Sequence, residues 1–402
     1  MKLELLLSRS CLWLTTLLPL FIIMGRGVSE SALTLTAILF VFLSGIKRDI
    51  KPFKEKWFLF FIAFWAYMIA RSFFADDIAL ALKKSIPIIR YALFALCFHK
   101  LCIKNSNTSK NILICLSIVV AFLSIDGYVQ FFRGIDILGR PSVYSSGYYR
   151  LTGPFTKMVL GSIIAILSFP LIYYCMHQIL KQKKNILLNS TFCFVIYFII
   201  MLSADRTALI QSTLCVGFSL MFLSKNPLKI FILGTLLFLL SALLLHVVGG
   251  KGLIERQFLS ILHSIKNYSS TPYGSIYNAA FAIIKQHWFF GVGPANYEHC
   301  VTMSVCSIHA HHIYLELLTE TGLVGLIMFG AVIYTILKST FRQNNSQPTL
   351  QVISYGITIF MIARFLPILP HQGLFKNFYA VPMWFMLGWL LHVNATISTN
   401  KR

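Results

Sequence analysis

The basic stretch KRDIKPFKEK, residues 47–56, lies between two apolar runs at about 31–46 and 57–74. Each run is close to the length that a helix needs to cross the hydrocarbon core of a bilayer, roughly 17–25 residues. In membrane proteins, Lys and Arg collect in the loops on the cytoplasmic side. The stretch therefore predicts two transmembrane helices joined by a cytoplasmic loop.

The same alternation of apolar run and basic loop continues along the whole chain of 402 residues. The chain is 57% hydrophobic and 12% charged, whereas soluble domains carry about 25% charged residues. We therefore expect an all-α, polytopic membrane protein that forms a single membrane domain over residues 1–402. Twelve spans are predicted, at about 10–25, 31–46, 57–74, 85–101, 111–131, 158–176, 186–203, 207–223, 230–248, 313–337, 350–368 and 374–392.

The charges of the loops predict the orientation. Every even-numbered connection is short and basic, as at 181–184 and 225–229, so both termini are expected in the cytoplasm. The first apolar run resembles a signal peptide, but no small-residue cleavage site follows it, and we interpret it as the first span. The same loops explain the net charge of +22, and the chain has no aromatic-basic motif for nucleic acid.

The longest outward connection is the loop 249–312, between the ninth and tenth spans. Residues 277–284 within it are amphipathic, which predicts one or more helices on the membrane surface. Loops of this length in compact proteins are usually functional. Cys300 and Cys306 would face the oxidising side, where a disulfide between them would pin the loop, and two free thiols are the alternative.

Charged residues in or beside membrane spans are costly and indicate function. Arg206 lies in the short outward turn SADRT, residues 203–207. Its rigid guanidinium suits phosphate or carboxylate oxygens. The alternative is structural, with Asp205 and Arg206 pairing and capping helix ends. The full set of such charges is Arg71, Arg90, Asp126, Arg206, Glu316, Glu320 and Arg364.

Titratable side chains concentrate where the long loop meets the tenth span, in HAHHIYLE, residues 309–316. His312, Glu316 and Glu320 follow at a spacing of four, which places them on one helix face if the helix begins by His312. Imidazole is suited to proton transfer near neutral pH. A metal site and a helix cap are alternatives, although no further ligand completes a zinc spacing. Gly322 and Gly325 would let a neighbouring helix approach closely.

These motifs resemble the superfamily of O-antigen ligases and O-antigen polymerases. Its signature is a histidine, one further residue, nine more residues and then Gly-x-x-Gly, which here runs from His311 to Gly325. The turn at 290–297, the motif LTGPF at 151–155 and Arg206 after the seventh span are also similar. The chain departs from the pattern in two places. His312 stands where an amide or hydroxyl is usual, and the stretch 267–274 has no second arginine.

The resemblance implies transfer of a glycan from undecaprenyl diphosphate to an acceptor on the periplasmic face of the inner membrane, with no metal and no cofactor. For a ligase, the acceptor is the lipid A–core oligosaccharide. It implies His311 and Arg206 as catalytic residues, with Arg256 and Lys266 as the nearest further cations for the diphosphate. His312, His309, Glu320, Gly322 and Gly325 would support the site, and Arg140 and Arg150 would bind acceptor phosphates.

Two other functions remain open. A polymerase would join lipid-linked repeat units, but the chain length and the late position of the long loop favour a ligase. A lipid-linked glycan transporter would show repeat symmetry or charges at the membrane midplane. Here the charges gather at the outer mouth of the spans, which favours transfer over transport.

Overall fold

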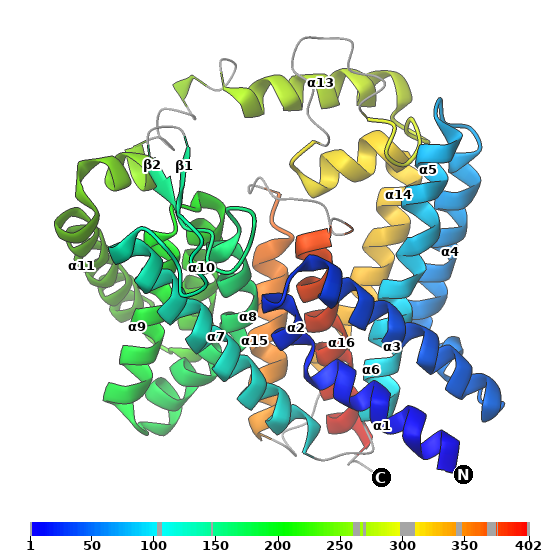
Figure 1. Ribbon diagram of the computed structural model, residues 1–402, viewed down its shortest axis with the longest axis horizontal. Coiled ribbons are helices and arrows are strands. Elements are labelled where there is room, and N and C mark those ends of the chain that lie inside the picture. Colours follow the sequence, from blue (N-terminus) through cyan, green and yellow to red (C-terminus); the bar gives the residue numbers. More distant parts are fainter. Residues whose placement is uncertain are drawn as a thin grey trace.

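The computed structural model describes residues 2–102, 107–145, 148–259, 266–267, 271–297, 310–342, 348–367, 375 and 377–399. Within them the chain forms a bundle of long helices and one small hairpin (Figure 1). The first half contains α1 (Lys2–Thr16), α2 (Leu18–Ile23), α3 (Arg26–Ile46), α4 (Lys56–Ser72), α5 (Ile78–Ser85), α6 (Ile89–Cys102), α7 (Thr108–Arg133), β1 (Val143–Ser145), β2 (Tyr148–Arg150) and α8 (Leu160–His177). The second half contains α9 (Ile186–Leu202), α10 (Arg206–Leu223), α11 (Pro227–Ile254), α13 (Pro272–His287), α14 (Ile313–Lys338), α15 (Pro348–Arg364) and α16 (Asn377–Thr399).

Six helices in the described residues are long and apolar enough to cross a membrane, namely α3, α7, α8, α10, α14 and α16. Two shorter apolar helical stretches are α9 (Ile186–Leu202) and the part of α11 from Gly234 to Val248. Each of the twelve predicted spans overlaps a helix, with α1 and α2 sharing the first. The prediction of a helical membrane protein is therefore confirmed, while the count of twelve spans stays a prediction.

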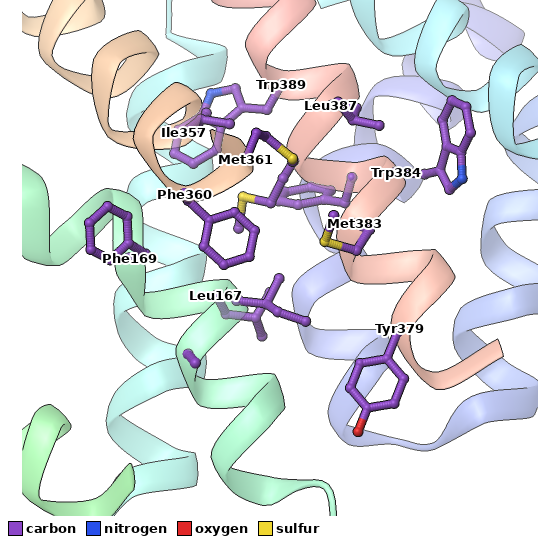
Figure 2. Packing of buried hydrophobic residues seen from close by; sticks show 14 of the residues in the cluster. Leu167, Phe169, Ile357, Phe360, Met361, Tyr379, Met383, Trp384, Leu387 and Trp389 are labelled. Atoms are coloured by element: carbon purple, nitrogen blue, oxygen red, sulfur yellow. The ribbon is translucent and has the colours of Figure 1, made fainter. Parts of the chain in front are cut away.

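The centre of the bundle is formed by α8, α15 and α16. Figure 2 shows Phe169 of α8, Phe360 of α15 and Trp384 of α16 among the side chains that fill it. Each of these three is almost completely buried. Helices in lipid gain little from the hydrophobic effect between them, so this close packing of large side chains holds them together.

Both terminal helices reach the same end of the bundle. The start of α1 and the last turn of α16 lie at one end, while α13 and the hairpin β1–β2 lie at the other (Figure 1). The predicted topology places the long loop and the termini on opposite sides, and the arrangement of these elements agrees with it.

The amphipathic segment of the long loop forms α13, which extends across the end of the bundle (Figure 1). Thr271 caps this helix by accepting the N–H of Gly274 on its hydroxyl at 3.0 Å. Pro272 follows at the first helical position, where its missing N–H costs nothing. Ala280 and Ile283 on its inner face are buried against the long loop and α14. The predicted surface helix is thus present, with one face covered by protein.

The outward segment between α7 and α8 contains the antiparallel hairpin β1–β2, a local departure from the all-α prediction. Gln130 of α7 organises the following segment, because its amide oxygen accepts the N–H groups of Thr152 and Gly153, both at 2.9 Å. Its amide nitrogen also donates to the hydroxyl of Thr152 at 2.9 Å. The motif LTGPF is therefore fixed to the end of α7.

Candidate active site

The turn before α10 holds Arg206 at the same end as α13. Residues 203–205 join α9 to α10, whose first residue is Arg206. Ala204 has a φ of 58°, a left-handed conformation that non-glycine residues seldom adopt. Asp205 caps α10 by accepting the N–H of Ala208 at 3.2 Å. The predicted tight turn is confirmed, and the capping alternative is correct for Asp205.

This turn packs directly on the first residues of α8. Ser162 donates its hydroxyl to the carboxylate of Asp205 at 2.5 Å. A Cβ atom on Gly161 would lie 2.2 Å from the hydroxyl oxygen of Ser203, so a glycine is required for this approach. The backbone that carries Arg206 is therefore fixed on both sides.

Arg364, the last residue of α15, supplies positive charge behind the turn. It is 4% exposed, and its Nη1 donates to the side-chain oxygen of Gln211 at 3.2 Å. Its guanidinium lies 5.7 Å from the ring centroid of Tyr379 and within electrostatic range of Asp205. The negative charge of Asp205 is thus balanced inside the bundle. Sequence reasoning noted Arg364 as a charge in a span but gave it no role.

Two further arginines, Arg206 and Arg150, lie within electrostatic range of Arg256 near this turn. Arg256 lies in the π-helical turn Glu255–Leu259 after α11, with its guanidinium 6.0 Å from the ring centroid of Tyr148. Burial, together with the positive charges of Arg206 and Arg150, lowers the pKa of Arg256 to about 10. Like charges this close repel one another, and a bound anion would relieve the repulsion. We call Arg150, Arg206 and Arg256 the arginine cluster.

Tyr273, in the first turn of α13, connects the arginine cluster to His311. It interacts electrostatically with Arg256, and its ring lies 5.8 Å from that of His311, nearly perpendicular to it. Tyr273 comes from the stretch 267–274, where the family pattern has its second arginine. Sequence reasoning missed Tyr273, because nothing local distinguishes it from the other tyrosines of the loops.

His311 has strained backbone geometry. Its φ is 47°, and it lies two residues before α14. A non-glycine residue in this region costs about 1–3 kcal/mol, and such strain clusters at functional sites. The strain and the position beside Tyr273 support His311 as the functional histidine of the stretch.

His312 has a supporting place, as the N-cap residue of α14. Its Nε2 lies 3.1 Å from the carbonyl oxygen of Pro367, and its ring packs against Tyr277 and Tyr314. Burial lowers the pKa of His312, and the hydrogen bond to Pro367 opposes this. The predicted shared face required the helix to begin by His312, but α14 begins at Ile313. Glu316 and Glu320 lie on one face, where both pair with Lys84.

Gly322 interrupts α14, with a φ of 65° and a ψ of −169°. The two backbone N–H groups after the break turn to the long loop. Leu323 donates to the carbonyl of Trp288 at 2.9 Å, and Val324 donates to that of Phe289 at 3.3 Å. The expectation that Gly322 admits a neighbouring helix is wrong, because a loop fills this place.

The same loop also bonds to the residues before the break. Val292 donates its N–H to the carbonyl of Thr319 at 2.8 Å, and Gly293 donates to that of Glu320 at 2.9 Å. The predicted turn is therefore confirmed, and it replaces the hydrogen bonds that the interrupted helix loses. Gly325 does face a helix, since a Cβ there would lie 3.3 Å from the ring of Tyr67 in α4.

We expect Gly322→Ala to destabilise the protein. A non-glycine residue at the φ of 65° and ψ of −169° found here costs about 1–3 kcal/mol, and the new Cβ would lie 2.2 Å from the carbonyl oxygen of Phe289. Thermal unfolding in detergent should show a lower midpoint than in the wild type. Gly330→Ala on the same helix is the control, because nothing lies within 4 Å of the Cβ it adds. Equal midpoints for the two variants would contradict this account of the break.

The remaining predicted residues lie apart from the arginine cluster or outside the described part. Arg140 donates to the carbonyl of Pro154 and so holds its own loop. Lys266 is exposed, and its neighbours on one side fall outside the described residues. Also outside them are His309, Cys300 and Cys306. Across the described ranges, no group of three or more His, Cys, Asp or Glu side chains could hold a metal ion.

An apolar groove of about 550 Å³ runs along α14 from its beginning to its end. It starts beside Ile313, two residues after His311, and reaches Lys338. A helix of this length spans roughly 35–40 Å, about the thickness of a bilayer with its interfaces. The groove is lined by Ile313, Tyr314, Leu317, Leu326, Phe329, Gly330, Ile333, Tyr334, Leu337, Lys338, Phe341 and Phe365.

The fold and the site define a class, a helical membrane protein with a cationic site and a histidine at one end of the bundle. Residues 191–330 match the family model described as O-Antigen ligase. The match includes Arg206, Arg256, His311 and Gly322. This match over part of the chain supports the resemblance to the superfamily of O-antigen ligases and polymerases, which indicates a membrane glycosyltransferase. A comparison with curated proteins finds no match to the chain.

Proposed function

We propose that the protein is an O-antigen ligase. It transfers a glycan from undecaprenyl diphosphate to the lipid A–core oligosaccharide on the periplasmic face of the bacterial inner membrane. The observation that carries this proposal is the place of Tyr273 between His311 and Arg256 of the arginine cluster. This arrangement offers a proton acceptor beside an anion site, as displacement of a diphosphate requires.

The arginine cluster would bind the diphosphate of the donor. A lipid diphosphate leaves readily if its growing negative charge is neutralised while the glycosidic bond breaks. Arg206 is held by the turn before α10, and Arg256 lies beside it on the turn after α11. Arg150 also approaches Arg256, so we assign it to the donor diphosphate instead of to acceptor phosphates. Arg140 and Lys266 have no place in this proposal for the diphosphate.

His311 would accept the proton of the acceptor hydroxyl as that oxygen attacks the anomeric carbon. Attack on the face opposite the diphosphate gives inversion at that carbon in a single step. Tyr273 between His311 and Arg256 would set the spacing of the proton acceptor and the leaving group. His312, buried and bonded to Pro367, would hold the backbone on which His311 depends.

The apolar groove along α14 is a suitable place for the polyprenyl chain of the donor. It starts next to the histidine, so a lipid lying in it would present its diphosphate at the end where the arginine cluster lies. This orientation puts α13 and the hairpin on the periplasmic side. The termini then lie on the cytoplasmic side, in keeping with the basic loops.

Lipopolysaccharide from a strain with the gene deleted tests the assignment. For a ligase, we expect core without O-antigen on the gel and accumulation of lipid-linked polymer. A core that carries a single repeat unit would instead identify a polymerase, because that acceptor is a second lipid-linked unit. Normal lipopolysaccharide in the deletion strain would exclude both.

Purified protein in liposomes gives the direct assay. Lipid-linked O-antigen and lipid A–core are the two substrates, and transfer is read as a mass shift of the core. We expect transfer in the presence of a chelator, because the proposed chemistry rests on arginine and histidine side chains. Transfer that depends on an added divalent cation would contradict this mechanism.

A further inference from the structure

The break at Gly322 makes the first part of α14 a separate short segment, Ile313–Thr321. We call it the half-helix. His312 caps its beginning, and His311 precedes the cap. The helix backbone beyond the break holds this segment less firmly, because the N–H groups of Leu323 and Val324 bond to the loop instead of to the half-helix. Contacts with neighbouring elements must therefore hold the half-helix and, with it, the histidines.

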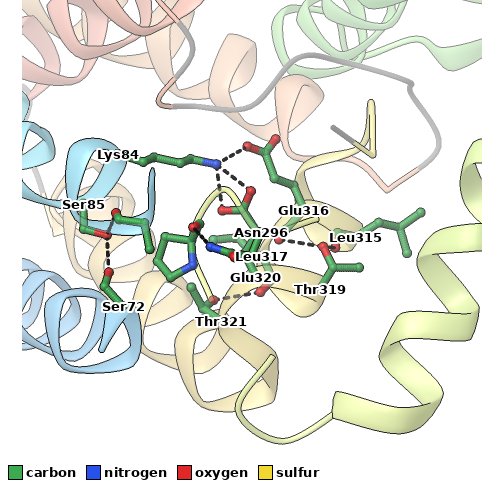
Figure 3. A network of polar contacts seen from close by, with 12 residues as sticks. Ser72, Lys84, Ser85, Asn296, Leu315, Glu316, Leu317, Thr319, Glu320 and Thr321 are labelled. Atoms are coloured by element: carbon green, nitrogen blue, oxygen red, sulfur yellow. Dashed lines mark hydrogen bonds and ion pairs between the residues drawn. The ribbon is translucent and has the colours of Figure 1, made fainter. Parts of the chain in front are cut away.

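Lys84, at the end of α5, binds the half-helix through two of its side chains. Figure 3 shows its ammonium group facing the carboxylates of Glu316 and Glu320. Its Nζ lies 3.1 Å from Glu316 Oε1 and 2.6 and 2.7 Å from the two oxygens of Glu320. The two carboxylates lie one turn apart, so a single ammonium group fixes both turns of the half-helix.

The site around Lys84 is largely enclosed, with 20% of the Lys84 side chain exposed, and has little room for water. The cavity between these side chains measures about 20 Å³, and Met68, Ile313, Leu317 and Phe375 complete its wall. Burial alone would lower the pKa of Lys84, but the charges of Glu320 and Glu316 outweigh it and raise the pKa. The ammonium group is therefore charged at neutral pH, and direct ion pairs hold the half-helix.

The element that carries Lys84 is itself anchored. Asp77 caps α5 by accepting the N–H of Leu80 at 2.8 Å. The backbone N–H of Asp77 donates to the side-chain oxygen of Asn296 at 2.8 Å, which ties α5 to the long loop. Ser72 at the end of α4 shares a hydrogen bond of 2.9 Å with Ser85, the residue after Lys84 (Figure 3). Lys84 thus projects from a fixed support.

A buried ion pair is weak evidence for stability, because desolvation offsets the attraction. Its better-attested use is to specify one arrangement. The half-helix has to be held in one position, because His311 precedes it while Arg206 lies in α10 and Arg256 in the turn after α11. Their spacing depends on where the half-helix sits.

We propose that Lys84 is a positioning residue for the transfer reaction. It acts through Glu316 and Glu320, and it holds the half-helix where His311 faces Tyr273 and the arginine cluster. This inference rests on the proposed function, in which Lys84 contacts neither the donor nor the acceptor.

The test compares Lys84→Met with Lys83→Met in the liposome assay. Lys83 is the exposed neighbour on the same helix, so the control removes the same charge outside the network. We expect kcat of Lys84→Met to fall about 10- to 100-fold, because displacements near 1 Å cost on this order. KM for the lipid-linked donor should change less than about threefold, since the arginine cluster is untouched.

Hydrogen exchange supplies a readout independent of turnover. In Lys84→Met, the amides of Ile313–Thr321 should exchange faster than in Lys83→Met, while those of α10 should not change. Equal kcat values and equal exchange for the two variants would overturn the inference and leave the proposed function standing. Failure of the wild type to transfer glycan would instead overturn the proposed function.

A triple variant separates positioning from charge balance. Lys84→Met leaves two buried carboxylates without their cation, and this alone could impair folding. A variant that combines Lys84→Met with Glu316→Gln and Glu320→Gln removes all three charges, so no buried carboxylate is left without its cation. We expect the triple variant to fold and to keep the loss in kcat, because the ion pairs are still absent. A wild-type kcat in the triple variant would overturn the positioning role.

Discussion

Replacing His311 with Ala should lower the kcat of glycan transfer by about 10²–10⁴-fold, the usual contribution of a general base. The acceptor hydroxyl would then have no side chain beside it to accept its proton as the new bond forms. The amount of protein in the membrane should match the wild type, because His311 is only half-buried and its replacement leaves no internal cavity. The liposome assay, with immunoblotting of the membrane fraction, measures both quantities.

His312→Ala is the matched comparison, since the two histidines are neighbours in the chain. His312 packs among tyrosines and bonds to Pro367, so we expect it to affect stability more than the chemical step. Its kcat should fall much less than that of His311→Ala. If His312→Ala lowered kcat more than His311→Ala, the catalytic histidine would be His312 instead of His311.

Replacing Arg206 with Ala should lower kcat by about 10²–10³-fold, the loss seen when one preorganised charge-stabilising group is removed. The reason is that the guanidinium neutralises the leaving diphosphate more strongly as the bond breaks. In cells, the variant should insert normally and yield lipopolysaccharide without O-antigen. A normal O-antigen ladder at normal protein levels would exclude the proposed role of Arg206 at the diphosphate.

Two further variants sharpen the result for Arg206. Arg206→Lys keeps the charge but loses the planar fork of donors, so we expect only partial activity. Arg133→Ala removes an exposed arginine from the last turn of α7, and it should leave transfer unchanged. Equal losses for Arg133→Ala and Arg206→Ala would indicate a general effect of net charge instead of a specific contact.

Much of the fold can be predicted from local sequence because its signals are local. Apolar runs of membrane length, basic loops and an amphipathic segment each report on a few consecutive residues. All the predicted spans overlap helices, and α13 forms where amphipathicity indicated it. The turn at Arg206 is likewise determined by residues 203–205, with Asp205 as the cap of α10.

Only part of the candidate site can be predicted from local sequence. Arg206 and His311 were predicted, the first from a charge in a tight turn and the second from family resemblance. Tyr273 carries no local feature that separates it from other loop residues, and Arg150 was predicted to bind acceptor phosphates instead of the donor diphosphate. Their place in the site depends on how α13 and the hairpin lie over the bundle, and no local pattern encodes that.

By itself, the sequence determined the class of protein and the helices, because periodicity and charge act over neighbouring residues. Together with the family resemblance, it also predicted Arg206, Arg256 and His311 as site residues. Only the tertiary structure decided that Gly322 breaks α14. The neighbouring sequence is typical of a helix, and the positive φ of Gly322 depends on hydrogen bonds with a loop that is distant in the chain. The tertiary structure also decided the partner of Glu316 and Glu320. Their spacing predicted a shared face, but the cation on that face is Lys84, which lies more than two hundred residues earlier in the chain.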